Sequence, residues 1–213
     1  KIKPNIEEAA KFLQALCNGK KGKFLFMPCY VEADGKTKQI ETKLGTFEQL
    51  SDYLIERNKR GYEIFFAVNR TDNSGRRTKQ NITGLRSLFV DSDEGPIKDF
   101  PIHPSAVINS RRGDHAYWFL KSKQDLGKFE NAQKKLISAL NTDSSVCDLS
   151  RCMRLPGFYH NGDKEKPFLV TVSSLRQNRY TIDEVVGGIS SPTFGAQKRS
   201  APTSSKGDKS STD

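Results

Sequence analysis

The run Leu88-Phe89-Val90-Asp91-Ser92-Asp93-Glu94-Gly95 constrains the fold more than any other part of this 213-residue chain. Its apolar residues predict a buried β-strand, and the acidic residues and glycine that follow predict that the strand ends at a polar surface. Side chains two apart on a strand lie on the same face, so Asp91 and Asp93 are expected to project together. Two carboxylates this close favour a divalent cation such as Mg²⁺ or Mn²⁺ between them. The plainer interpretation is a strand that runs into an acidic turn.

The remaining predicted elements mix helices and strands without the regular alternation of a doubly wound parallel sheet. Apolar spacing predicts helices over 6–17, 46–58 and 124–141 and a short helix from 181. Apolar runs predict strands over 23–31, 38–43, 62–69, 85–93, 105–110, 115–120 and 168–173, with 141–162 irregular. Pro28 is expected to put the first strand at an edge or bulge, and Asp34-Gly35 to form a turn. Together, these elements predict an α+β fold with helices packed on a mainly antiparallel sheet.

Composition and charge narrow the class of protein. The formal net charge is +10, which favours polyanionic partners, nucleic acid first and acidic membrane surfaces second. The four cysteines form no CxxC pair, so we expect reduced thiols in an intracellular protein, with neither a zinc ribbon nor a disulfide framework. No apolar run approaches membrane-spanning length, and no signal peptide is visible.

One folded domain is expected over residues 1–186. From Gly187 to Asp213 the composition turns to Ser, Gly, Pro, Thr and Lys, which predicts a disordered tail or a linker. Because the chain begins at Lys1 rather than at methionine, we expect it to be a fragment of a longer protein.

A basic turn follows the strand over 105–110. Arg111-Arg112-Gly113-Asp114 joins it to the next strand, as expected of a β-hairpin, and His115 begins that second strand. A phosphate group would satisfy the donors of Ser110, of both arginines (Arg111 and Arg112) and of His115 together. The alternative is a structural histidine.

The segment from Asp148 to Gly157 adds a third carboxylate and two arginines. Arg151 and Arg154, three apart, are expected on the same side of one helical turn, where they could hold a polyphosphate. A surface loop with salt bridges is the alternative. Three carboxylates could hold two divalent metals, and the arginines could neutralise a triphosphate, which together suit nucleotidyl transfer.

The polar segment over 70–81 is a mobile loop or, in the sharper interpretation, a loop that contacts nucleic-acid phosphates. Its candidate contact residues are Arg70, Arg76, Arg77 and Lys79.

The order of these motifs resembles the catalytic core of the archaeo-eukaryotic primase superfamily, and most of all its RepB-like primase and primase-polymerase branch. The motifs are a strand ending in DxD, then Ser-x-x-Gly-x-His-x-Tyr-Trp, then Asp-x-x-Arg-x-x-Arg-Leu-Pro-Gly. They run from about residue 61 to 161, with a looser likeness from the N-terminus to about 186. Gly113 departs from the pattern, since serine often stands there in the family.

The resemblance implies roles for individual residues. Asp91, Asp93 and Asp148 match the family's metal ligands and catalytic acids, for Mg²⁺ or Mn²⁺. Nucleotide contacts are implied for a second group, with Asn161 the least certain: Ser110, Arg112, His115, Arg151, Arg154 and Asn161. The implied fold has two lobes, with the acids on an antiparallel, RRM-like sheet and a smaller N-terminal lobe.

The implied activity is template-dependent addition of ribo- or deoxynucleoside triphosphates to a 3′-hydroxyl on single-stranded DNA. The implied partners are a template and primer, and in the whole protein a helicase or C-terminal priming domain; the implied location is the cytoplasm or nucleoid, in a phage or mobile-element context. The main rival is a replication-initiation module that binds DNA without catalysis. A DxD glycosyltransferase would explain neither the net charge nor the segment from 148 to 157. A rolling-circle nickase is disfavoured because the three histidines are scattered.

Overall fold

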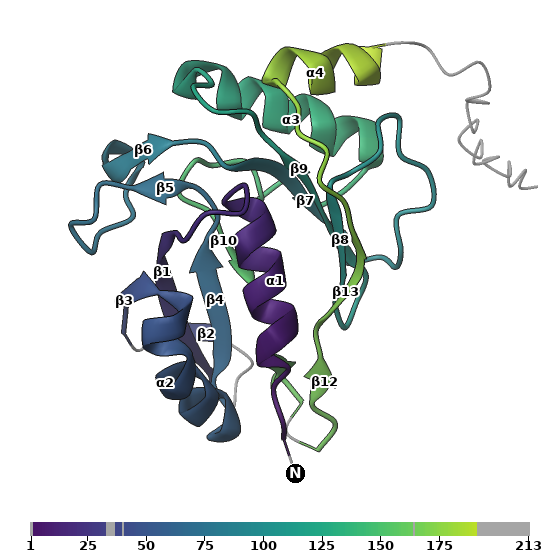
Figure 1. Ribbon diagram of the computed structural model, residues 1–213. Coiled ribbons are helices and arrows are strands. Elements are labelled where there is room, and N and C mark those ends of the chain that lie inside the picture. The colour runs from purple at the N-terminus through teal and green to yellow at the C-terminus, as the bar shows by residue number, and fades with distance from the viewer. Residues whose placement is uncertain (1, 33–36, 40, 164, 191–213) are drawn as a thin grey trace, which may run out of the picture.

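Two antiparallel sheets form the protein, and helix α1 (Ile6–Leu16) lies between them (Figure 1). The computed structural model describes residues 2–32, 37–39, 41–163 and 165–190. The predicted α+β class with antiparallel pairing is confirmed.

The first sheet has the strand order β10-β4-β1-β2, with β3 also paired to β1. Its strands are β1 (Lys23–Val31), β2 (Thr37–Gln39), β3 (Lys43–Thr46), β4 (Glu63–Ala67) and β10 (Cys152–Arg154). Helix α2 (Phe47–Lys59) packs against it. The predicted capping box begins this helix, since the Thr46 hydroxyl accepts from the Gln49 amide and the Gln49 side chain accepts from the Thr46 amide.

The second sheet has the order β13-β8-β9-β7. Its strands are β7 (Ser87–Asp91), β8 (Ala106–Asn109), β9 (Asp114–Phe119) and β13 (Thr171–Leu175). The predicted hairpin is confirmed as β8 and β9. Helix α3 (Phe129–Leu140) packs on β7, and α4 (Ile182–Ser190) packs on α3 (Figure 1).

Short elements complete the chain. Strands β5 (Arg70–Thr71) and β6 (Ile82–Gly84) form a hairpin over part of the predicted loop, and β11 (Tyr159–His160) pairs with β12 (Phe168–Leu169). Single 3₁₀ turns cover Lys79–Asn81 and Leu126–Lys128.

The two sheets share one apolar core through α1. The ring of Phe12 lies 5.8 Å from that of Phe66 on β4 and 5.2 Å from that of Tyr117 on β9, all three fully buried. Both sheets therefore pack against the same side chain of one helix.

The prediction that Pro28 places β1 at an edge or bulge is wrong, because β1 lies inside the sheet. Its pairing with β3 ends at Phe26, and its pairing with β2 begins at Cys29. Pro28 therefore falls in the gap between these two partners, where a missing N–H costs no ladder bond, and it pairs only with Ile64 on β4.

Several predicted boundaries also move. The α-helix expected from 124 begins at Phe129, because Asp125 caps a 3₁₀ turn instead. The stretch over 141–162 contains β10 and β11 rather than being irregular throughout. Helix α4 continues through Gly187 to Ser190, into the expected tail, whereas 191–213 and the turn at Asp34-Gly35 lie outside the described residues.

All four cysteines, each in the described part of the chain, carry free thiols. Within the described residues no helix is both long and apolar enough to span a membrane.

Candidate active site

A polar cavity of about 540 Å³ opens where the acidic end of β7 faces the first sheet. It brings together five of the predicted site residues: Asp91, Asp93, Ser110, Arg112 and Arg154. Arg111, the other arginine of the predicted phosphate-binding turn, also lines it. The remaining lining residues were not predicted: Glu63, His160, Gly162 and Asp163.

Asp91 is the last residue of β7, and its side chain is 19% exposed. Burial, with the nearby negative charge of Asp93, raises the pKa of its carboxyl to about 6. Its Oδ1 atom is buried without a hydrogen-bond partner. The charged form of this carboxylate is thus destabilised by its surroundings.

Asp93 lies two residues beyond the strand, in a loop that packs on the hairpin turn. The Ser92 hydroxyl donates to Gly95 O at 2.8 Å, and Gly95 forms a bridge to Gly113. A Cβ at Gly113 would lie 2.1 Å from Ser92 O, so only glycine allows this approach. The departure from the family pattern at Gly113 therefore has a local steric reason.

His115 lies behind Asp91 rather than on the cavity wall. The two residues are register partners, and His115 Nε2 lies 3.4 Å from Asp91 Oδ1. Its side chain is 1% exposed, and burial lowers its pKa to about 3, so the imidazole is neutral near pH 7. The structure supports a role beneath Asp91 and places His115 out of direct reach of the cavity.

Glu63 anchors the opposite wall. This carboxylate on β4 is 1% exposed; it forms an ion pair with Arg154 at 3.0 Å, and its Oε1 lies 3.1 Å from His160 Nε2. Burial lowers the pKa of His160 to about 4. The sequence signal was a carboxylate inside the apolar run EIFFA, where an unpaired charge would be costly.

The hairpin turn supplies further cations. Arg111 is held by Asp163 at 2.7 Å, whereas the exposed side chain of Arg112 has no ion-pair partner among the described residues. The Ser110 hydroxyl donates to Gly113 O at 2.9 Å. Arg112 is therefore the cation most available to an incoming anion.

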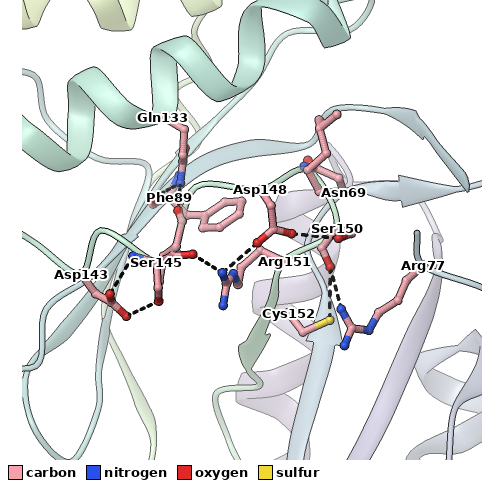
Figure 2. A network of polar contacts seen from close by, with 12 residues as sticks. Asn69, Arg77, Phe89, Gln133, Asp143, Ser145, Asp148, Ser150, Arg151 and Cys152 are labelled. Carbon is pink, nitrogen blue, oxygen red and sulfur yellow. Dashed lines mark hydrogen bonds and ion pairs between the residues drawn. The ribbon is translucent and has the colours of Figure 1, made fainter. Parts of the chain in front are cut away.

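Asp148 and Arg151 are not among the lining residues; they pair with each other at 2.8 Å, and Ser150 also donates to Asp148 (Figure 2). The prediction that Arg151 and Arg154 share a helical turn is wrong, because the chain is extended there: Arg154 ends β10 and Arg151 precedes it. Each arginine pairs with a different acid.

Asp143 takes a position near Asp91 that the sequence did not indicate. Its backbone N–H donates to Asp91 O at 2.9 Å, and its charge contributes to the raised pKa of Asp91. Figure 2 shows Asp143 bonded to Ser145, beside the Asp148–Arg151 pair. No pattern in the sequence singled out this residue.

The remaining predicted residues lie elsewhere. Asn161 is buried and donates to Asn58 O and Tyr62 O, so its observed contacts hold main chain together. Arg77 donates to Ser150 O, and Lys79 pairs with Glu130. Arg76 is exposed, and Arg70 lines a different cavity.

The donor set fits a divalent cation only in part. The carboxylates of Asp91 and Asp93, which both line the cavity, offer the hard oxygen ligands that Mg²⁺ and Mn²⁺ prefer. Throughout residues 2–32, 37–39, 41–163 and 165–190, however, no three acidic, histidine or cysteine side chains stand close enough to hold a metal ion. The three predicted carboxylates are therefore not assembled into one cluster.

Comparisons with known proteins give structural matches only. No family model and no curated protein matches the chain. The AEP domain of the primase-polymerase of cyanophage S-2L matches with a TM-score of 0.68 at 17% identity, over 86% of this chain and 97% of that one. The catalytic domain of primase RepB′ in complex with initiator DNA gives a TM-score of 0.60 at 16% identity, over 88% and 94%. Another structure of RepB′ gives 0.61 at 16% identity, over 87% of this chain and 62% of that one.

Proposed function

We propose that this chain, which has the fold of the archaeo-eukaryotic primase catalytic domain, is a DNA primase-polymerase that adds nucleotides to a 3′-hydroxyl on single-stranded DNA. One observation carries the proposal. The carboxylates of Asp91, whose side chain is 19% exposed, and of Asp93 line one cavity together with the arginines Arg112 and Arg154. Acids facing cations across one cavity suit a metal-bound triphosphate.

In this proposal Asp91 and Asp93 hold Mg²⁺ or Mn²⁺. The bound ion would supply positive charge to activate the 3′-hydroxyl and to stabilise the leaving pyrophosphate. Arg112, free of ion pairs among the described residues, would bind the triphosphate, and Arg154 would add a second cation held in place by Glu63. Neutral His115 would support Asp91 from behind without competing for the anion.

The template is proposed to be held mainly through its backbone. The exposed arginines of the β5–β6 hairpin, Arg70 and Arg76, fit that role best, because Arg77 and Lys79 already have partners. A DNA complex is described for the RepB′ catalytic domain, and binding by this chain is inferred from its charge.

The test is nucleotide incorporation on a primed single-stranded template with Mg²⁺ or Mn²⁺. Asp91→Asn keeps the size of the side chain and removes its charge, so we expect incorporation to fall by about 100-fold or more. Asp52→Asn, at an exposed position of α2, is the matched control and should keep full activity. Equal activity of the Asp91→Asn and unaltered proteins would contradict the proposal.

A second candidate is a replication-initiation module that binds DNA without catalysis. The specific observation in its favour is the ion pair of Asp148 with Arg151, which occupies the expected third metal ligand. DNA binding by the unaltered protein, with no incorporation under Mn²⁺, would establish this alternative.

A further inference from the structure

A second cavity, of about 710 Å³, lies at the other end of β7 and β9 from the acids. It shares no lining residue with the acid-containing cavity. Seven of its fifteen lining residues are lysine or arginine, and none is acidic. Two of the seven, Lys21 and Lys121, form ion pairs with Glu48 and Glu184, which lie outside the lining. We call it the basic cavity. Arg86 immediately precedes β7 and Asp91 ends it, so at about 3.3 Å per residue the two sites lie roughly 16 Å apart along the strand.

Arg86 carries a buried charge with only neutral partners. Its side chain donates to Lys23 O at 2.8 Å and to Val68 O at 3.3 Å, and its guanidinium lies 4.2 Å from the centre of the Phe24 ring. The residue is 9% exposed, and burial lowers the pKa of the guanidinium. Within the described part of the chain, no carboxylate forms an ion pair with it.

Arg179 repeats this arrangement on another wall. It donates to Leu120 O at 3.2 Å, to Asn18 Oδ1 at 3.0 Å and to Ala15 O, all neutral acceptors. Burial lowers its pKa as well. A desolvated charge without a counter-charge is unfavourable, and a bound anion would offset this cost.

The rim adds cations from two separate segments. Lys20 lies in the turn after α1, Lys23 begins β1, and Arg70 belongs to the neighbouring β5–β6 hairpin (Figure 1). The three have no ion pair with any described residue. The Arg70 guanidinium lies against Gly84, where a Cβ would come within 3.1 Å of it. Gly84 therefore leaves room for this arginine.

We propose that the basic cavity binds the phosphodiester backbone of a single-stranded nucleic acid, as a contact separate from the site of nucleotide addition. Its cations come from the turn after α1, from β5, from the start of β7 and from the chain near Leu120 and Arg179. One phosphate engages only a few donors, whereas cations spread along a cavity match the successive phosphates of a strand. The proposal does not require the chain to catalyse nucleotide transfer.

The test measures binding of the full chain to a fluorescein-labelled oligodeoxythymidylate by fluorescence anisotropy over a range of salt concentrations. The variant Lys20→Gln/Lys23→Gln removes two exposed rim cations that have no part in the proposed template contact of the β5–β6 hairpin. We expect about a tenfold loss of affinity, and a dependence of log K on log salt that is shallower by about 1.4, because each phosphate contact on a single strand contributes about 0.7.

The matched control is Lys134→Gln/Lys135→Gln, which removes the same charge from an exposed face of α3. It should change affinity by less than about twofold and leave the salt dependence unchanged. An equal loss in both variants would show that only overall charge matters and would overturn the proposal, as would no loss in the rim variant.

A competition experiment distinguishes binding of a nucleic-acid strand from binding of a free polyphosphate. Inorganic tripolyphosphate should displace the oligonucleotide only at concentrations far above that of unlabelled oligonucleotide. If tripolyphosphate displaces the oligonucleotide at an equal concentration of phosphate groups, the basic cavity binds free polyphosphate, and the proposal that it binds a nucleic-acid strand is overturned. Asp91→Asn should bind the oligonucleotide normally, so failure of this proposal and failure of the proposed function give different results.

Discussion

At Asp91, burial and neighbouring negative charge act on the same carboxyl group. Together they raise its pKa to about 6, against a smaller opposing effect of the positive charges of Arg154 and Arg151. The folded protein therefore holds a proton there between about pH 4 and 6 that the unfolded chain has released. The contribution of this carboxyl to stability falls as pH rises through that window.

Protonation of His115 has the opposite effect on the pH dependence of stability. Burial lowers its pKa to about 3, whereas the unfolded chain binds the proton near 6.5. The stability that depends on its neutral form is therefore complete above about pH 6.5 and is lost as pH falls.

Between about pH 6 and 4, the free energy of unfolding of the unaltered protein falls partly because His115 takes up a proton on unfolding. We expect His115→Gln to lose this contribution, so that its free energy of unfolding falls less steeply, by about 1.4 kcal/mol per pH unit. The measurement is urea unfolding across that range without divalent metal. The slope is the readout, since removing a buried imidazole also lowers overall stability. His103→Gln, at an exposed position, should keep the slope of the unaltered protein; an unchanged slope in His115→Gln would refute the assignment.

At the scale of elements, β7 is an edge strand whose open side is covered by α3. The Gln133 side chain accepts from Phe89 N at 3.3 Å and donates to Phe89 O and, at 3.0 Å, to Val146 O. The Gln133 side-chain amide thus makes the hydrogen bonds to Phe89 that a neighbouring strand would otherwise make. Further along the same edge, the Asp143 N–H donates to Asp91 O. The edge that carries the acids is therefore held by side-chain and loop contacts, as Figure 2 shows for Gln133.

We expect Gln133→Leu to lower the free energy of unfolding by about 3 kcal/mol, because it leaves several buried main-chain groups unpaired. Incorporation should fall too, since Asp91 lies two residues beyond Phe89. Urea unfolding measures the first effect and the primed-template assay the second. Asn131→Leu, on the exposed side of the same helix, is the control and should change neither.

For the whole molecule, α1 makes one cooperative unit of two sheets that each carry one wall of the acid-containing cavity. Glu63 and Arg154 come from the first sheet, and Asp91 comes from the second. The distance between acids and cations therefore depends on how both sheets pack on Phe12.

Phe12→Ala is expected to cost about 4 kcal/mol of stability, the usual range for a buried phenylalanine, and to affect both sheets. Hydrogen exchange should show reduced protection in β4 and in β9 alike. Loss of protection in one sheet only would contradict a shared core. Phe65→Ala, at a half-buried position of β4, should cost less.

Local sequence determined the elements whose causes lie within a few residues. The capping box at Thr46, the β8–β9 hairpin around Gly113, and the strand ending at Asp91 all follow from short-range hydrogen bonding and side-chain alternation. The order of motifs also led to a family whose fold the structural matches confirm.

Tertiary structure decided that two arginines close in sequence take different partners. Arg151 and Arg154 are neighbours in sequence, yet one pairs with Asp148 and the other with Glu63, 91 residues away. Pro28 sits inside a sheet because its two partner strands leave a gap there. Ion pairing and strand order depend on contacts between distant segments, and the packing of both sheets on α1 sets those contacts.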